Sequence, residues 1–99
     1  MASYTATQAK TVTLTNGQVD TFTLTGTGER LHIAVTANHK PIYFTVGYVG
    51  ESIANPSVEG TDCYVFDYQN TMDFHWHGAP VQVKVIAAGT PTITVMLVP

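Results

Sequence analysis

Apolar and polar residues alternate along most of this chain, and this period of two is typical of β-strands that bury one face. In one segment, Leu31, Ile33 and Val35 alternate with His32 and Ala34. About eight segments of this kind follow one another, roughly ten residues apart. They cover residues 11–15, 21–25, 31–36, 42–46, 63–66, 72–76, 81–85 and 93–97. Since no stretch has apolar residues at the i, i+3, i+4 and i+7 positions of a helix, we expect short strands throughout.

Turn-forming residues separate these segments. They are Asn16-Gly17, Gly26 to Gly28, Asn38 to Pro41, Gln69-Asn70, Gly78 to Pro80 and Gly89 to Pro91. The stretch 47–61 is the longest connection and the best candidate for a functional loop. Strands with one apolar face need a second sheet to cover that face. We therefore predict an all-β fold, a single-domain antiparallel β-sandwich of about eight short strands.

The segments on either side of Asn16-Gly17 conflict with a simple hairpin. A two-residue turn there places Val12 opposite Thr21, so the apolar side chains of the two strands fall on opposite faces. A three-residue turn through Gln18 pairs Val12 with Phe22 and restores one apolar face. We therefore expect either a bulged hairpin or two strands that lie in different sheets. We also expect Gly17 to have a positive φ.

Length, composition and charge narrow the possible functions. The 99 residues make one domain, and only 11% of them are charged, well under the roughly 25% of an ordinary soluble domain. The basic residues are scattered along the chain at Lys10, Arg30, Lys40 and Lys84. With a net charge of −3 and no basic cluster, nucleic-acid binding is not expected. The most apolar stretches, 81–88 and 93–98, are far shorter than the roughly 20 residues that span a bilayer, so a membrane role is not expected either.

Cysteine usage and the first residues bear on the compartment. Cys63 is the only cysteine, which excludes an internal disulfide. It lies in a strand pattern, 62–66, without a nearby histidine, and we expect a buried, unreactive thiol. The first ten residues have no apolar core like that of a signal peptide, so we expect a protein made and kept in a cytoplasm-like compartment.

One cluster of side chains has the chemistry of a metal site. Asp73, His75 and His77 alternate on one side of a predicted strand. Neighbouring positions lie roughly 6.6 Å apart, so two imidazoles could share a zinc ion, but all three span about 13 Å and would need a ligand from another strand, such as His32. The alternative is a polar face turned to solvent. We expect no metal and no cofactor.

No catalytic motif is evident, and we do not expect an enzyme. Gly26 to Glu29 lacks the Lys-Ser/Thr pair of a phosphate-binding loop, and no serine lies in a Gly-x-Ser-x-Gly turn. The aromatic residues leave another possibility open, a platform on which sugar rings stack, although aromatic residues of a sandwich more often pack in its core or on a sheet face. The candidates for such a platform are Tyr43, Tyr48, Tyr64, Tyr68 and Trp76.

The two ends of the sequence differ in character. Residues 1–9 are polar, and we expect a flexible N-terminal arm that orders on contact with a partner, followed by the sandwich domain at 10–99. The segment Met96 to Pro99 is apolar to its last residue, and we expect it to be covered either by its own domain or by a neighbouring subunit.

Three segments of the second half carry a resemblance to a known family. They are Pro41-Ile-Tyr-Phe-Thr-Val46, Gly60-Thr-Asp-Cys-Tyr-Val65 and 81–91, which runs into a last strand. In this order and spacing they resemble capsid decoration (cement) proteins of tailed bacteriophages, of the actinobacterial-phage type. The family often has Asp-Gly after the Tyr-Phe-Thr strand, where this chain has Gly47-Tyr48, and the segment His75 to His77 is particular to this chain.

The resemblance implies a structural virion protein without catalytic residues. Such a β-sandwich binds the outer surface of an assembled capsid, where it contacts the major capsid protein, acts as a homotrimer and reinforces the contacts between capsomers. It would be made in the host cytoplasm and reside on the virion. The predicted contacts with the capsid or with other subunits are Tyr4, Thr5, Met96, Leu97, Val98 and Pro99. The alternative function is a carbohydrate- or receptor-binding module of a phage fibre or tail.

Overall fold

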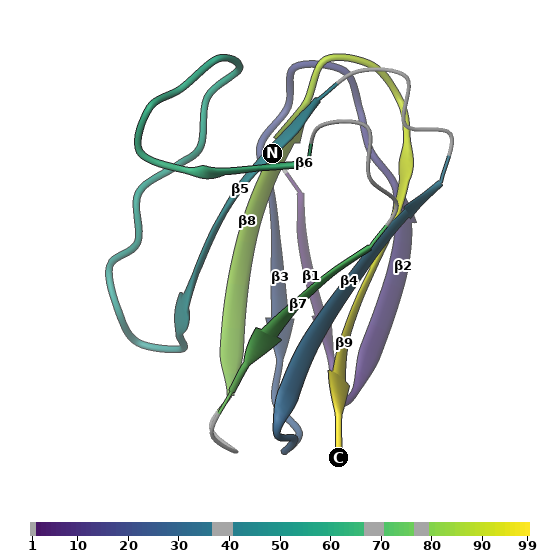
Figure 1. Cartoon of the computed structure of the whole chain (residues 1–99), viewed down its shortest axis with the longest axis vertical. Coiled ribbons are helices and arrows are strands. Elements are labelled where there is room, and N and C mark those ends of the chain that lie inside the picture. Colours follow the sequence, from purple (N-terminus) through teal and green to yellow (C-terminus); the bar gives the residue numbers. More distant parts are fainter. Residues whose placement is uncertain (1, 37–40, 67–70, 77–79) are drawn as a thin grey trace.

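The predicted β-sandwich is confirmed. The computed structural model describes residues 2–36, 41–66, 71–76 and 80–99, and these residues form nine strands in two packed sheets (Figure 1). The strands are β1 (Ser3–Ala6), β2 (Ala9–Thr13), β3 (Asp20–Leu24), β4 (Arg30–Thr36), β5 (Ile42–Tyr48), β6 (Tyr64–Phe66), β7 (Thr71–His75), β8 (Val81–Ala87) and β9 (Thr92–Val98). No helix in the described part of the chain is long and apolar enough to cross a membrane.

The two sheets differ in size and in the origin of their strands. One has five strands in the order β1-β3-β8-β5-β6, and the other has four in the order β2-β9-β4-β7. Strands β1 and β3 run parallel, whereas every other neighbouring pair is antiparallel. Strands that are consecutive in the sequence therefore often lie in different sheets, and the long connection between β5 and β6 lies outside both layers (Figure 1).

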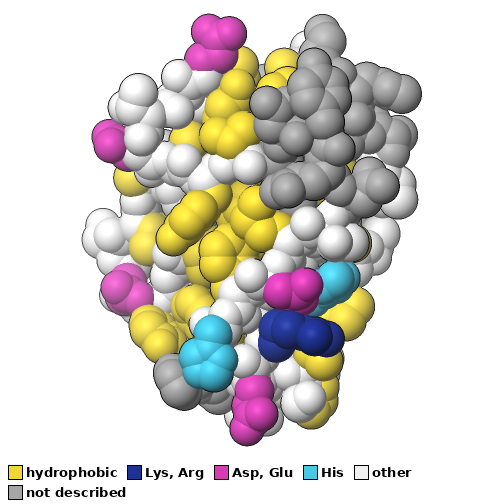
Figure 2. Space-filling view, viewed as in Figure 1, with side chains coloured by type: hydrophobic (Ala, Val, Ile, Leu, Met, Phe, Trp, Pro, Cys, Tyr) yellow, Lys and Arg dark blue, Asp and Glu magenta, His cyan; other side chains and the backbone are white. Residues whose placement is uncertain are grey.

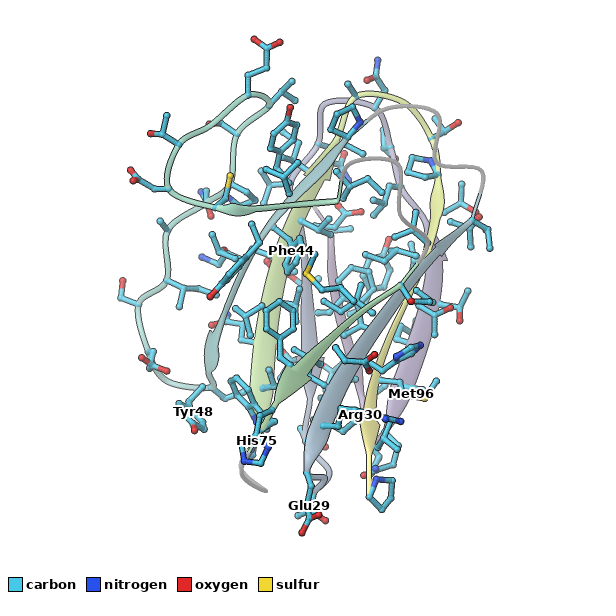
Figure 3. All side chains as sticks on the ribbon, in the orientation of Figure 1. Glu29, Arg30, Phe44, Tyr48, His75 and Met96 are labelled. Atoms are coloured by element: carbon cyan, nitrogen blue, oxygen red, sulfur yellow. The ribbon has the colours of Figure 1, made fainter. Side chains whose placement is uncertain are left out.

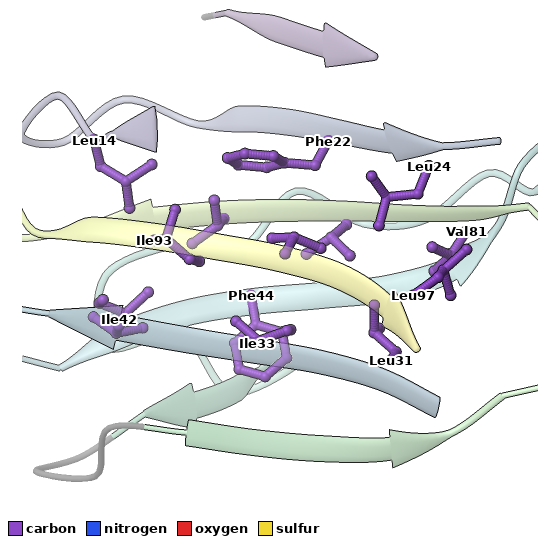
Figure 4. Close-up of a cluster of buried hydrophobic side chains, with 14 of the residues drawn as sticks. Leu14, Phe22, Leu24, Leu31, Ile33, Ile42, Phe44, Val81, Ile93 and Leu97 are labelled. Carbon is purple, nitrogen blue, oxygen red and sulfur yellow. The ribbon is translucent and has the colours of Figure 1, made fainter. Parts of the chain in front are cut away.

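The alternation of the sequence becomes one hydrophobic core between the sheets (Figure 4). Phe22 and Leu24 of β3 are fully buried, and they face a layer that includes Ile33 of β4 and Val95 of β9, also fully buried. Burying one such side chain stabilises the fold by about 1.5–3 kcal/mol. The core therefore provides the rigid scaffold on which every surface described below is held.

At Asn16-Gly17 the structure has the second of the two expected arrangements, in which the two strands lie in different sheets. Strand β2 lies in the four-stranded sheet and β3 in the five-stranded sheet, so the chain crosses between layers at this turn. Gly17 has a φ of 72°, as expected, and its N–H donates to the carbonyl of Ala87 at 2.9 Å. Because the two strands belong to opposite sheets, Val12 and Phe22 can both point inward without sharing a register.

The N-terminal segment differs from the expected flexible arm. Ser3–Ala6 forms β1, which pairs with the edge of β3. The physical reason is an alternation too short to stand out in the sequence, in which Tyr4 and Ala6 point toward the core and Tyr4 packs on Phe22 with ring centroids 5.3 Å apart. The carboxylate of Asp20, which is 1% exposed, accepts hydrogen bonds from the Ala2 N–H at 3.1 Å and from the side-chain amide of Gln18 at 2.7 Å. These contacts fix the start of β1.

The apolar C-terminal segment is covered by its own domain at one position. Leu97 is 1% exposed and belongs to the core, because β9 is an interior strand between β2 and β4. Met96 and Val98 point the other way and are half-buried, and Pro99 is exposed. The domain itself therefore covers Leu97 and leaves Pro99 exposed, and coverage by a neighbouring subunit stays a prediction.

Cys63 differs from expectation in its burial. It is half-buried rather than buried, and it lies just before β6 rather than within it. Its thiol is 3.7 Å from the carbonyl oxygen of Gly60, to which it donates a weak hydrogen bond. The sequence pattern at 62–66 starts two residues before β6 does, because the chain turns at Gly60 before it joins the sheet.

Candidate functional site

The residues predicted as interface contacts do not form one patch. Thr5 is exposed on β1, whereas Tyr4 beside it packs inward on the core. Leu97 is fully covered and is unavailable to a partner. Met96 lies on the outer face of the four-stranded sheet, opposite Ala9 of β2 and His32 of β4. The two terminal segments thus offer separate surfaces on different sheets.

A single side chain nevertheless ties the two terminal segments together. Gln8 lies between β1 and β2, and its amide nitrogen donates to the carbonyls of Leu97 and Thr27 at 3.0 and 3.1 Å. Its backbone carbonyl accepts the Leu97 N–H at 2.8 Å, and its side-chain oxygen accepts the Thr27 N–H at 3.2 Å. The path of the chain from β1 to β2 is therefore fixed against the end of β9.

The cluster considered as a metal site from the sequence contains an ion-pair group. Asp73 accepts a hydrogen bond from Nδ1 of His32 at 2.7 Å and lies 3.3 Å from Nε of Arg30. His75 lies opposite Arg30 in the register of β4 and β7, and His77 falls outside the described residues. Among the described residues no three His, Cys, Asp or Glu side chains are grouped to hold a metal ion. His32 does approach Asp73, as considered from the sequence, but as a hydrogen-bond partner.

Threonine side chains cover the other end of the same sheet face. Thr11 of β2 lies opposite Thr94 of β9, with the hydroxyl oxygens 2.8 Å apart. Thr13 and Thr92 form a second such pair at 3.0 Å. This end of the face is polar without charge, and the hydroxyls satisfy each other rather than aiming at a bound group.

The aromatic residues considered as a sugar platform separate into buried and exposed ones. Tyr43 and Trp76 are 8% and 9% exposed, and Tyr68 falls outside the described residues. Tyr48 and Tyr64 are exposed, at 40% and 53%. Each exposed ring rests on a second ring. Tyr48 packs against Trp76 with centroids 4.6 Å apart, and Tyr64 stacks on Phe44 at 5.4 Å.

The connection between β5 and β6, residues 49–63, is fixed against the outer face of the five-stranded sheet. The hydroxyl of Thr45 donates to the carbonyl of Ala54 at 2.7 Å, and Nζ of Lys84 donates to the carbonyl of Ile53 at 3.2 Å. Ile53 packs so closely on β5 that a Cβ at Gly47 would lie 2.5 Å from its Cγ2. Gly47 is thus required by this close approach of Ile53 to the strand.

Two tight turns shape the same connection. The N–H of Glu51 donates to the carbonyl of Tyr48 at 3.0 Å, and the N–H of Gly60 donates to the carbonyl of Ser57 at 2.8 Å. In the second turn Glu59 has a φ of 60°, and no other non-glycine residue of the described segments has a positive φ. Left-handed backbone is unfavourable for a residue with a Cβ. The turn therefore places the Glu59 carboxylate outward at a conformational cost.

The stretch 48–65, which we call the loop segment, concentrates two kinds of exposed side chain. The exposed large hydrophobic side chains of the described residues all belong to it: Tyr48, Val49, Val58, Tyr64 and Val65. It also contains three exposed acidic residues, Glu51, Glu59 and Asp62, and no Lys or Arg. The sequence prediction singled out this connection by its length but missed its charge, which a sum of charges over the segment would have found.

No family model, curated protein or solved structure matches this chain in the three comparisons made.

Proposed function

We propose that this chain is a structural virion protein that binds the outer surface of an assembled phage capsid and reinforces contacts between capsomers. The observation that carries the proposal is where the three resembling segments lie. Residues 41–46 lie in β5, residues 60–65 lead into β6, and residues 81–91 contain β8. Strands β8, β5 and β6 are neighbours in one sheet. The resemblance therefore falls on one contiguous part of the fold rather than on scattered turns.

The character of the domain supports the same function. It is small and rigid, with extents of 31 × 25 × 21 Å, and much of its polar surface is threonine rather than charge. A surface of this kind repels like copies weakly, so many copies can be packed side by side. On this proposal the chain acts as a homotrimer and contacts the major capsid protein, and each copy adds weak contacts that together give high avidity on the shell.

Co-sedimentation tests the proposal. The purified protein is mixed, at micromolar concentration, with mature capsids assembled from the major capsid protein encoded in the same genome, and separately with that protein unassembled. We expect the chain to pellet with capsids and to bind the unassembled subunit poorly, because multivalent contacts exist only on the shell. If the intact protein stays in the supernatant of mature capsids, the decoration function is refuted.

A carbohydrate- or receptor-binding module of a fibre or tail is the second candidate, and one observation favours it. Tyr64 exposes about half of its surface while the ring is held by Phe44. A fixed aromatic face is the usual support for a stacked sugar ring. A glycan-array screen of wild type and Tyr64→Ala distinguishes the two candidates, since a specific glycan signal that Tyr64→Ala abolishes supports this function and a blank array supports the first.

A further inference from the structure

We propose that the loop segment, 48–65, is the docking surface of this protein, and that its partner is a basic protein surface with apolar side chains among its Lys and Arg residues. The inference deepens the proposed function and rests on it, since the partner named there is the outer face of the capsid. It departs from the sequence prediction, which placed the contacts at the two ends of the chain.

Charge is unevenly distributed along the chain. The whole net charge of −3 belongs to the loop segment, since Glu51, Glu59 and Asp62 lie there while the other four acidic residues are balanced by the four basic ones. Among the described residues the ion pairs all involve Asp73, so none of the three loop carboxylates is paired with a described cation. Figure 2 shows acidic side chains spaced along the margin where Figure 1 has this loop. The loop segment therefore carries three exposed carboxylates on its outer side, while the Lys84 ammonium group lies on its inner side.

Exposed apolar side chains lie among these carboxylates in the loop segment. Val49 and Val58 are 48% and 43% exposed. Neutral polar residues are common in this chain, which has few charged ones, so composition does not explain valine at these exposed positions. Hydrophobic side chains lie beside the acidic ones in Figure 2. An exposed apolar patch rimmed by charge is typical of a protein–protein contact, where the apolar part provides affinity and the charge provides orientation and rate of association.

The loop is anchored to the sheet without a partner. The hydrogen bonds from Thr45 and Lys84, together with the packing of Ile53 on Gly47, fix its inner side to the sheet. Its outer side keeps the strained turn at Glu59. A surface ordered before binding loses less conformational entropy when a partner arrives. A merely connecting loop needs neither these anchors nor a left-handed glutamate.

The chemistry of the surface selects the class of partner. Carboxylates repel the phosphates of nucleic acids and of anionic lipids, and they attract Lys and Arg side chains. Valine and tyrosine side chains require an apolar counterpart to be buried. The C-terminal segment is separate from this surface, since Figure 3 shows Tyr48 and Met96 at opposite margins of the molecule. The N-terminal strand β1 and strand β6, which follows the loop, lie at opposite edges of the five-stranded sheet. A basic protein surface with a shallow apolar patch meets both requirements.

Two variants with equal net charge test the inference on capsids. Glu59→Gln with Asp62→Asn removes two loop charges, and the control, Thr15→Lys with Thr36→Lys, adds two positive charges at exposed positions away from the loop. We expect the loop variant to bind capsids about tenfold more weakly and to lose most of the salt dependence seen for wild type between about 0.05 and 0.5 M salt. The control should bind within about twofold of wild type. Val58→Ser, at an exposed turn position, should also weaken binding.

A second measurement does not depend on the capsid. A peptide of alternating Lys and Val is titrated into labelled protein, and backbone amide shifts are recorded by NMR. We expect shifts concentrated at 48–65 and lost in the Glu59→Gln, Asp62→Asn variant. Capsid binding that is equal for the loop variant and wild type overturns the inference and leaves the proposed function standing. If wild type does not bind capsids, the proposed function is refuted, and the peptide titration alone tests the docking surface. Shifts that are absent, or that lie outside 48–65, then overturn the inference.

Discussion

Substitutions of two adjacent residues at the end of β9 can distinguish a role of this segment in the core from a role in an interface. Leu97 is 1% exposed in the core, and Met96 points out of the opposite face of the same strand. Replacing Leu97 by Ala removes buried methyl groups and leaves a cavity, which costs about 2–5 kcal/mol. Met96→Ala removes a half-buried side chain from the surface and should cost about 1 kcal/mol or less. Against a typical total stability of about 5–15 kcal/mol, the first loss is large and the second is small.

Urea denaturation measures both variants, with the emission of Trp76 as the signal, because Trp76 is the only tryptophan and is 9% exposed. For a domain of this size each kcal/mol lowers the melting temperature by about 4–8 °C, so Leu97→Ala should melt at least roughly 8 °C below wild type. Sedimentation velocity run beside it reports self-association. If Leu97→Ala keeps wild-type stability but loses self-association, the assignment of Leu97 to the core is wrong. If Met96→Ala destabilises as much as Leu97→Ala, the assignment of Met96 to the outer face is wrong.

Three further substitutions test the turns and the buried carboxylate. Gly17→Val should cost on the order of 1 kcal/mol or more in urea denaturation because φ is positive there, and a neutral result would place the strain elsewhere. Glu59→Gly should leave stability equal or raise it by up to about 1 kcal/mol, and a clear loss in the same assay would contradict the left-handed turn. Asp20→Ala should cost about 1–3 kcal/mol because the Ala2 N–H and the Gln18 amide lose their acceptor, and amide exchange at β1 should quicken. Unchanged exchange there would show that Asp20 does not hold β1.

The alternation of residues was enough to predict the fold class, but not the pairing of strands. The burial of side chains such as Ile33 and Val95 can be predicted from the residues beside them in sequence, because successive side chains of a strand point to opposite faces of the sheet. The partner of a strand is not encoded nearby. Thr11 pairs with Thr94, 83 residues away, and nothing local distinguishes that partner from any other threonine in a strand. For the same reason the sequence left two arrangements open at Asn16-Gly17.

The candidate site was harder to predict for a related reason. The acidic character of Glu51, Glu59 and Asp62 could have been summed from the sequence, but the exposure of Val49 and Val58 depends on how the loop packs on β5. Conversely, the apolar residues of 96–99 read alike in sequence, and only the interior position of β9 separates the buried Leu97 from its neighbours. Surface chemistry follows from tertiary packing, which a pattern of single residues does not contain.

The position of β9 has a consequence for the order of folding. Because β9 lies between β2 and β4, the four-stranded sheet has no continuous hydrogen-bonded ladder until the last strand of the sandwich has left the ribosome. Until then β2 has no hydrogen-bonded partner in its sheet, and β3 lacks its contacts with β9 across the core. Folding dominated by contacts so distant in sequence is slow. We therefore expect the sandwich to form only after synthesis of β9 is complete. During synthesis the exposed strand edges of different chains can pair with one another, unless the chains are dilute or bound by chaperones.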